Sequence, residues 1–175
     1  MKFLLVFTLL LAAILSSCSS QNEAVGFPII LQTESTECGP VCLKMIAQHY
    51  KINVDLKELF RLTKMDDDGT SLLSLCQAAD SIGLTTLAAR VELNKINGDS
   101  LPLPAILHWD GNHFVVLYKA SKNKLWIADP AIGKVEYSKE EFCKHWGSSE
   151  SKTKSGIIML LEVNDSIKTN HLNKK

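Results

Sequence analysis

The chain lacks several features that mark broad classes of protein. It has no excess of charge, because 19 lysine and arginine residues balance 19 aspartate and glutamate residues, so the basic patch typical of nucleic-acid-binding proteins is missing. It has no GxxxxGK[ST] loop for phosphates, and neither the CxxC pairs nor the HExxH spacing of metal sites. The sequence therefore predicts no nucleic-acid partner, no ATPase activity, no metal centre and no cofactor.

What is present is typical of an ordinary globular protein. Hydrophobic residues make up 46% of the chain and charged residues 22%, which disfavours disordered and collagen-like classes. A length of 175 residues suits one domain with a substantial core and is too short for two.

The amino-terminal segment is typical of an export signal. Its apolar run from Phe3 to Leu15 is shorter than the roughly 20 residues of a membrane-spanning helix. The run ends in small residues followed by Cys18, which resembles the bacterial lipobox, whose cysteine is lipidated. We therefore expect a signal peptide over 1–17, a lipid anchor on Cys18, a flexible tether over 18–26, and a location in the bacterial cell envelope, facing the periplasm or the exterior. Ordinary signal cleavage without lipidation is the alternative.

The other cysteines are Cys38, Cys42, Cys76 and Cys143. An exported chain can keep disulfides, and four cysteines allow two, but their spacing resembles no disulfide framework. Cys42 and Cys76 lie among apolar residues at helical spacing, so we expect them to be buried thiols.

Hydrophobic periodicity changes from helical to extended at Gly83. Helices are expected over 40–50, 55–64, 71–82 and 138–146, and strands over 84–90, 104–108, 113–119, 125–128, 134–137 and 157–163. Asp55 with Glu58, and Ser138 with Glu141, have the spacing of capping boxes. The order predicts an α+β domain over 27–165, with a helical half, an antiparallel sheet half and a cleft between them, followed by a polar tail over 166–175.

Cys38 is the candidate nucleophile. It lies at the start of the first expected helix, where unpaired N–H groups favour a thiolate. It also requires a histidine as base, and His108 and His113 are the candidates. His113 is favoured because it begins an apolar strand, although a structural role remains open for either histidine.

Two further residues are candidates to complete the site. Asp129 ends the next strand and could hold the imidazole in one orientation, although an Asp-Pro pair is also a common turn. Gln32 precedes Cys38 and could donate a hydrogen bond to an oxyanion, although it could equally be a surface residue.

These motifs together resemble the peptidase C39 family, which are papain-like cysteine protease domains that remove double-glycine leaders from bacteriocins and peptide pheromones. The resemblance covers about 27–163 and rests on Gln32, Glu37-Cys38-Gly39-Pro40, Gly69-Thr70-Ser71-Leu72, Leu103 to Trp109, Asn112 to Leu117, and Asp129-Pro130. It implies that Cys38 is the nucleophile, His113 the general base and acid, Asp129 the orienting residue and Gln32 the oxyanion donor.

The resemblance also implies a substrate and a partner. The substrate is a peptide cleaved after the second glycine of its leader, and the partner is an ABC exporter, in which such domains commonly form the amino terminus. This chain has no nucleotide-binding motif, so we expect it to act apart from the exporter, outside the inner membrane. The alternatives are a leader-binding module that does not cleave, and an acyltransferase or amidase on the same papain-like scaffold.

Overall fold

The computed structural model describes residues 26–97, 101–147 and 154–164. The predicted signal peptide, Cys18, nearly all of the tether and the polar tail lie outside these residues. Within the described ranges, no helix combines the length and the apolar composition needed to cross a membrane.

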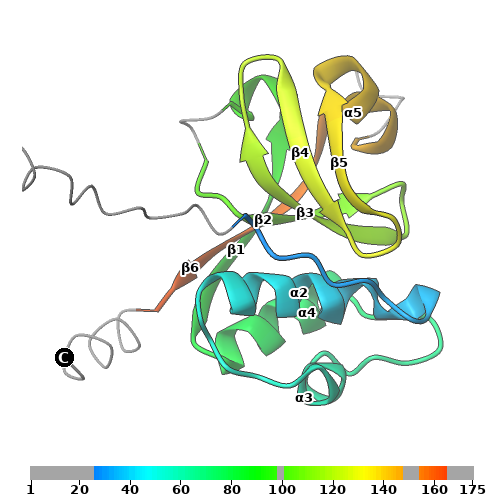
Figure 1. Cartoon of the computed structure of the whole chain (residues 1–175), viewed down its shortest axis with the longest axis vertical. Coiled ribbons are helices and arrows are strands. Elements are labelled where there is room, and N and C mark those ends of the chain that lie inside the picture. The colour runs from blue at the N-terminus through cyan, green and yellow to red at the C-terminus, as the bar shows by residue number, and fades with distance from the viewer. Residues whose placement is uncertain (1–25, 98–100, 148–153, 165–175) are drawn as a thin grey trace, which may run out of the picture.

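The first half of the domain is helical. A short 3-10 helix, η1 (Ser35–Glu37), leads into α2 (Cys38–His49), which is followed by α3 (Leu56–Leu62) and α4 (Leu72–Ser81). Figure 1 shows these helices packed together below the sheet. Helix α2 is buried on almost every side because α3, α4 and a strand of the sheet all pack against it.

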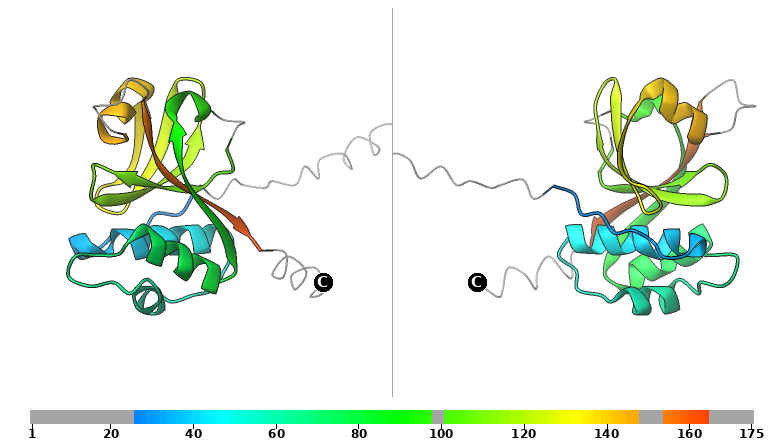
Figure 2. Two further views of the ribbon diagram at one scale, coloured as in Figure 1. Left: turned by 180° about the vertical axis from the view of Figure 1, so that it is seen from behind. Right: turned by 45° about the vertical axis from the view of Figure 1, so that its right-hand side comes forward.

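The second half is one antiparallel sheet of six strands in the order β1-β6-β2-β3-β4-β5. The strands are β1 (Leu84–Glu92), β2 (Ala105–Trp109), β3 (His113–Ala120), β4 (Lys124–Asp129), β5 (Gly133–Ser138) and β6 (Ser155–Val163). A 3-10 turn, η2 (Leu93–Lys95), follows β1, and α5 (Lys139–His145) follows β5. Figure 2 shows that the sheet curls strongly, which brings α5 round toward β6.

The central strands β2, β3 and β4 have consecutive buried residues, and because successive side chains of a strand point to opposite sides, these strands contribute to a core on each face of the sheet. In β2, Ile106 belongs to the core shared with the helices, whereas Leu107 belongs to a second core with Phe142 and Trp146 beside α5. The indole Nε1 of Trp146 donates to the Ile157 carbonyl at 3.0 Å, which fixes the end of α5 to β6.

The predicted α+β class and the division into two halves are confirmed. Each expected helix and strand is present within about two residues of its expected bounds. The position of β6, inserted between β1 and β2, was not expected, because a local pattern identifies a strand without identifying its neighbours.

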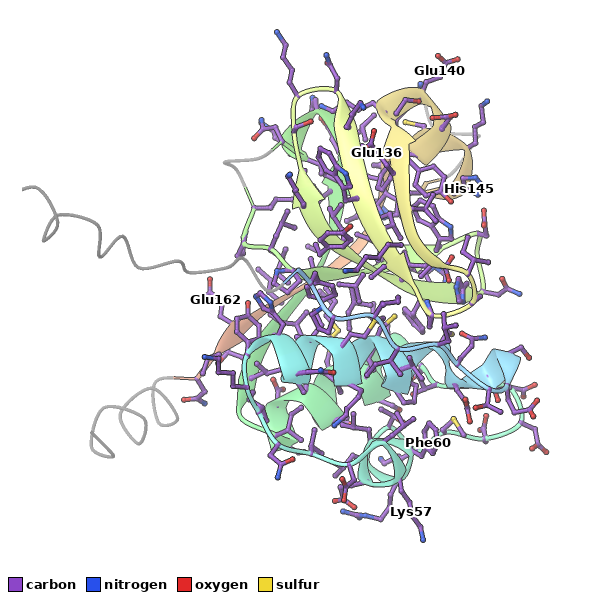
Figure 3. The ribbon with its side chains drawn as sticks, in the orientation of Figure 1. Lys57, Phe60, Glu136, Glu140, His145 and Glu162 are labelled. Atoms are coloured by element: carbon purple, nitrogen blue, oxygen red, sulfur yellow. The ribbon has the colours of Figure 1, made fainter. Side chains whose placement is uncertain are left out.

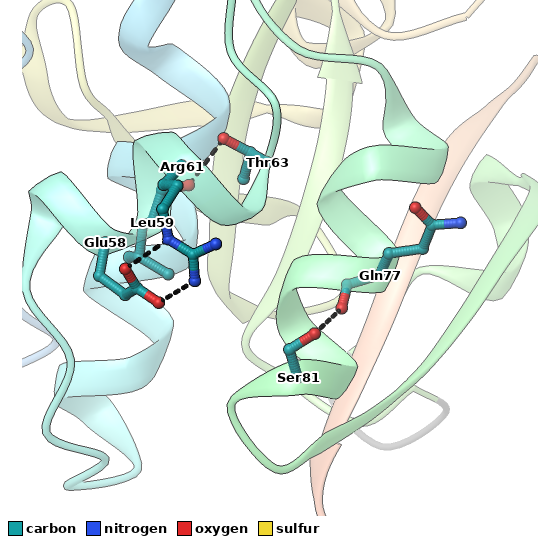
Figure 4. Close-up of polar contacts among 6 residues, drawn as sticks. All are labelled: Glu58, Leu59, Arg61, Thr63, Gln77 and Ser81. Carbon is teal, nitrogen blue, oxygen red and sulfur yellow. Dashed lines mark hydrogen bonds and ion pairs between the residues drawn. The ribbon is translucent and has the colours of Figure 1, made fainter.

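One of the two expected capping boxes is wrong. Asp55 occupies the position before α3, but its side chain makes no capping hydrogen bond. Glu58 binds Arg61 instead, with contacts of 2.9 and 2.5 Å (Figure 4). The bidentate pair with the Arg61 guanidinium, one turn further along α3, replaces the hydrogen bond to the backbone N–H of Asp55 that a capping box requires. The box at Ser138 is confirmed.

The four described cysteines are free thiols. Cys42 is fully buried, as expected. The expectation that Cys76 is buried is wrong, because its side of α4 is only partly covered and the residue is half-buried.

Gly39 in the first turn of α2 gives a test of the packing between the two halves. A Cβ atom at this position would lie 2.4 Å from Cγ2 of Thr70 and 3.3 Å from the Phe114 ring. Thr70 cannot move away easily, since its hydroxyl donates to the Thr63 carbonyl at 2.7 Å. We expect Gly39→Ala to lower the free energy of unfolding by about 1–3 kcal/mol in a urea titration.

Gly26→Ala is the control for this substitution. A Cβ atom there would make only an ordinary contact, 3.7 Å from the Lys134 amine. A Gly39→Ala protein as stable as the Gly26→Ala protein would show that the junction of the two halves is looser than described.

Candidate active site

Cys38 is the first residue of α2, as the sequence predicted. Cys38 is buried, with only 6% of its surface exposed. The first-turn N–H groups of a helix place positive potential at this end, which favours the thiolate over the thiol. Pro40 lacks an N–H group, but at this place in the helix no carbonyl partner is lost.

His113 and Asp129 are brought together by the pairing of β3 with β4. His113 is the first residue of β3 and Asp129 the last of β4, so the antiparallel strands place them at the same edge of the sheet. The imidazole Nε2 lies 2.8 Å from Oδ1 of Asp129. Asp129 Oδ1 also accepts from the Ala131 N–H at 2.8 Å, so this aspartate forms both the predicted turn and the predicted contact with histidine.

The thiol of Cys38 lies close enough to the His113 ring to influence the pKa of the imidazole. Because Nε2 faces Asp129, Nδ1 is the ring atom left to face the thiol. Burial of the ring lowers the pKa of His113, but the hydrogen bond to Asp129 and the negative charges of Asp129 and Cys38 outweigh burial and raise this pKa from 6.5 to about 9. The ring is therefore an imidazolium at neutral pH, which is the partner that a thiolate requires.

Gln32 lies in the same region. It lines a hollow of about 410 Å³ together with His113 and Asp129. Its Oε1 atom is buried and has no hydrogen-bond partner among the described residues. Rotating the amide by 180° would place its NH₂ group at this buried point, since the two orientations have nearly the same shape. The amide thus keeps an unused hydrogen-bonding position close to His113 and Asp129.

His108, the other candidate base, does not join this group. It lies within β2, where its ring contacts Phe114 at 5.5 Å between centroids, and burial lowers its pKa. It lines a separate hollow of about 360 Å³ with Thr70 and Phe114. The structure thus distinguishes between the two histidines that the sequence left open.

The two hollows both include Asn112 in their lining. The first also contains Thr70 and Phe114, whose side chains pack against Gly39, the residue after Cys38. The second also contains His113 and Gln32.

Sequence reasoning missed two polar contacts near the site. The Cys42 thiol donates to the Phe114 carbonyl at 3.2 Å and so fastens α2 to the strand that begins with His113. Its pKa is raised by burial, which makes it an inert anchor. The spacing of four residues from Cys38 was the available signal, because it places both thiols on one face of the helix.

The second missed contact is another carboxylate and imidazole pair. Asp110, in the turn between β2 and β3, lies 3.0 Å from the His145 ring. That ring stacks on Trp109, with 5.2 Å between centroids and 10° between planes. Figure 3 shows His145 on the sheet half, at the opposite end of the molecule from Lys57 and Phe60 of α3. No hydrogen bond joins this pair to a described cysteine, although Cys143 lines the same hollow as Asp110 and His145.

The chain resembles known proteins across most of the described domain. The model of the peptidase C39 family matches residues 26–150. A probable microcin-H47 secretion/processing ATP-binding protein of Escherichia coli is 38% identical over 136 residues, which are 78% of this chain and 19% of that protein. The colicin V secretion/processing ATP-binding protein of Escherichia coli is 39% identical over 68% of this chain and 17% of its own length. The chain thus spans about a fifth of these relatives.

Among solved structures, a double glycine motif protease from an AMS/PCAT transporter, in complex with its leader peptide, superposes with a TM-score of 0.70. It is 32% identical, and the match covers 78% of this chain and 91% of that one. An α+β fold that groups a thiol, an imidazole and a carboxylate is the arrangement used by cysteine peptidases. This chain belongs to the peptidase C39 family.

Proposed function

We propose that this protein is an endopeptidase that hydrolyses a peptide bond after a Gly-Gly pair, with Cys38 as its nucleophile. The observation that carries the proposal is the hydrogen bond of 2.8 Å between His113 and Asp129 beside Cys38, with an imidazole whose pKa is raised to about 9. A ring held in this way can take part in proton transfer with the nucleophile and with the leaving amine.

The mechanism follows from the position of each group. The Cys38 thiolate attacks the carbonyl carbon of the second glycine, and the electron pair of the C=O bond moves to its oxygen. The Gln32 amide and the Cys38 backbone N–H donate to that oxyanion. His113 then gives its proton to the leaving amine as the C–N bond breaks, which leaves a thioester on Cys38. Water, deprotonated by the now neutral His113, attacks the thioester and releases the leader carboxylate.

The preference for glycine before the cleaved bond is supported by similarity to proteins whose substrate is named. The leader-bound structural neighbour is a protease of the double glycine motif, which supports the same substrate class.

The direct test is product analysis with synthetic peptides. The full chain is incubated with a leader peptide that contains Gly-Gly followed by several residues, and the products are identified by mass spectrometry. The proposal expects a new amino terminus directly after the second glycine, and no cleavage of a peptide with Val-Val at those positions. A transferred acyl group without free carboxylate would instead indicate an acyltransferase, and binding without cleavage a leader-binding module.

We further propose that Cys18 is lipidated and holds the domain at a membrane of the cell envelope, with an ABC exporter as partner. Support comes from the apolar run that ends in small residues before Cys18, and from relatives named as secretion/processing ATP-binding proteins.

Replacement of the lipidated cysteine tests the anchor. We expect Cys18→Ser to move the protein from the membrane fraction to the soluble fraction of lysed cells, because the acyl chains are then not attached. Cys76→Ser, which changes a thiol inside the folded domain, should leave the protein in the membrane fraction. Equal membrane fractions for Cys18→Ser and the wild-type protein would contradict the anchor.

A further inference from the structure

The side chain of Glu37 points back along the chain from the residue just before Cys38. Its Oε2 atom accepts from the backbone N–H of Thr33 at 2.7 Å and from that of Glu34 at 3.2 Å. Hydrogen bonds to an ionised carboxylate are about twice as strong as those between neutral groups. Glu37 therefore clamps the two residues that directly follow Gln32.

The backbone of Gln32 is also held from the other side. Its N–H donates to the Pro130 carbonyl at 2.8 Å, and Pro130 directly follows Asp129. The segment that carries Gln32 is thus fixed between a residue adjacent to Cys38 and a residue adjacent to Asp129. Because Gln32 Oε1 has no partner among the described residues, these backbone contacts set the position of the amide.

We infer that Glu37 is a positioning residue for the oxyanion donor Gln32. The inference rests on the proposed function, and it assigns Glu37 an indirect role, since its carboxylate contacts backbone N–H groups of the preceding segment. An oxyanion donor acts only within a few tenths of an ångström of its proper place, so loosening the clamp weakens binding of the oxyanion in the transition state more than binding of the substrate.

The test is a double-mutant cycle measured with a Gly-Gly leader peptide. We expect Gln32→Ala to lower kcat by about 10²-fold. We expect Glu37→Ala to lower kcat by about 10-fold or more with little change in KM, because only the transition state is affected. If Glu37 acts through Gln32, the double variant is no slower than Gln32→Ala alone. Glu37→Gln, which keeps an acceptor oxygen, should recover part of the rate.

Two controls separate positioning from general damage to the fold. Glu58→Gln changes another glutamate that makes two side-chain hydrogen bonds, on α3 (Figure 4), and it should leave kcat unchanged. The alkylation rate of Cys38 should be the same in Glu37→Ala and in the wild-type protein, because the pair of Cys38 and His113 does not include Glu37.

Three results would overturn the inference: an unchanged kcat in Glu37→Ala, losses that multiply in the double variant, or slower alkylation of Cys38. Backbone hydrogen exchange gives an answer that needs no substrate. Glu37→Ala should speed exchange at the Thr33 and Glu34 amides, which lose their acceptor, and unchanged exchange there would overturn the clamp. The wild-type protein could cleave no peptide while exchange at these amides is still faster in Glu37→Ala than in the wild type. That pair of results would refute the proposed function and leave the clamp supported.

Discussion

Replacing Cys38 with alanine abolishes peptide cleavage while the protein stays folded. We expect kcat to fall by at least about 10³-fold, because the remaining groups can bind a substrate but cannot form the thioester. The substitution removes a single sulfur atom, so the melting temperature should change little. Both quantities are measured on the full chain, by peptide hydrolysis and by thermal denaturation.

Cys76→Ala is the matched control for this loss. It removes a half-buried thiol from α4, which is not part of the site, and should leave cleavage intact. Cleavage that persists in Cys38→Ala would assign the nucleophile to another residue. If Cys38→Ala loses both cleavage and the folded structure, Cys38→Ser, which keeps a group of similar size, separates loss of the nucleophile from loss of the fold.

The second large effect is the dependence of kcat/KM on pH, which Asp129 sets through its contact with His113. Because the pKa of His113 is about 9, the imidazolium is present below this pH and is lost above it. We therefore expect kcat/KM to fall as the pH rises past about 9, since a neutral ring cannot protonate the leaving amine. Asp129→Asn keeps a hydrogen-bond acceptor for Nε2 but removes the charge, so this fall should move to lower pH.

Asp129→Ala removes the hydrogen bond as well as the charge. We expect it to lower kcat by about 10²-fold or more, because the ring then loses its fixed orientation. Asp80→Asn, an exposed carboxylate on α4, should leave the pH profile in place. A profile that does not move in Asp129→Asn would contradict the assigned coupling between Asp129 and His113.

The raised pKa of His113 also makes the stability of the folded protein decrease as the pH rises. The folded-state pKa of His113 lies above the ordinary histidine value of 6.5. The contribution of this group to the free energy of unfolding is therefore complete below about pH 6.5 and is lost as the pH rises through about 9.

Much of the site followed from sequence because its residues lie at the ends of regular elements. Cys38 begins a helix, while His113 begins one strand and Asp129 ends the next. Adjacent antiparallel strands place such ends at one edge, so the local pattern indicated that Asp129 could meet a histidine of the preceding strand. His108 and His113 could not be separated by pattern alone, and the family resemblance was needed to choose between them.

The features that sequence did not reveal depend on contacts between distant segments. The insertion of β6 between β1 and β2 depends on which strands pair, and periodicity carries no such information. The capping box expected at Asp55 failed because Arg61 competes for Glu58. Glu37 was part of a motif behind the family resemblance, but the sequence assigned it no role, since that role depends on how the loop before it folds back.

The most direct measurement of the central claim is the rate of alkylation at each cysteine of the full chain, followed by mass spectrometry across pH. The comparison is internal, because burial raises the pKa of the Cys42, Cys76 and Cys143 thiols, whereas Cys38 alone faces an imidazolium. The account predicts that Cys38 reacts first at neutral pH although it is nearly buried, and that His113→Ala removes this selectivity. Alkylation of Cys38 no faster than that of Cys76 and Cys143 would show that the thiolate and imidazolium pair does not form, and would contradict the account.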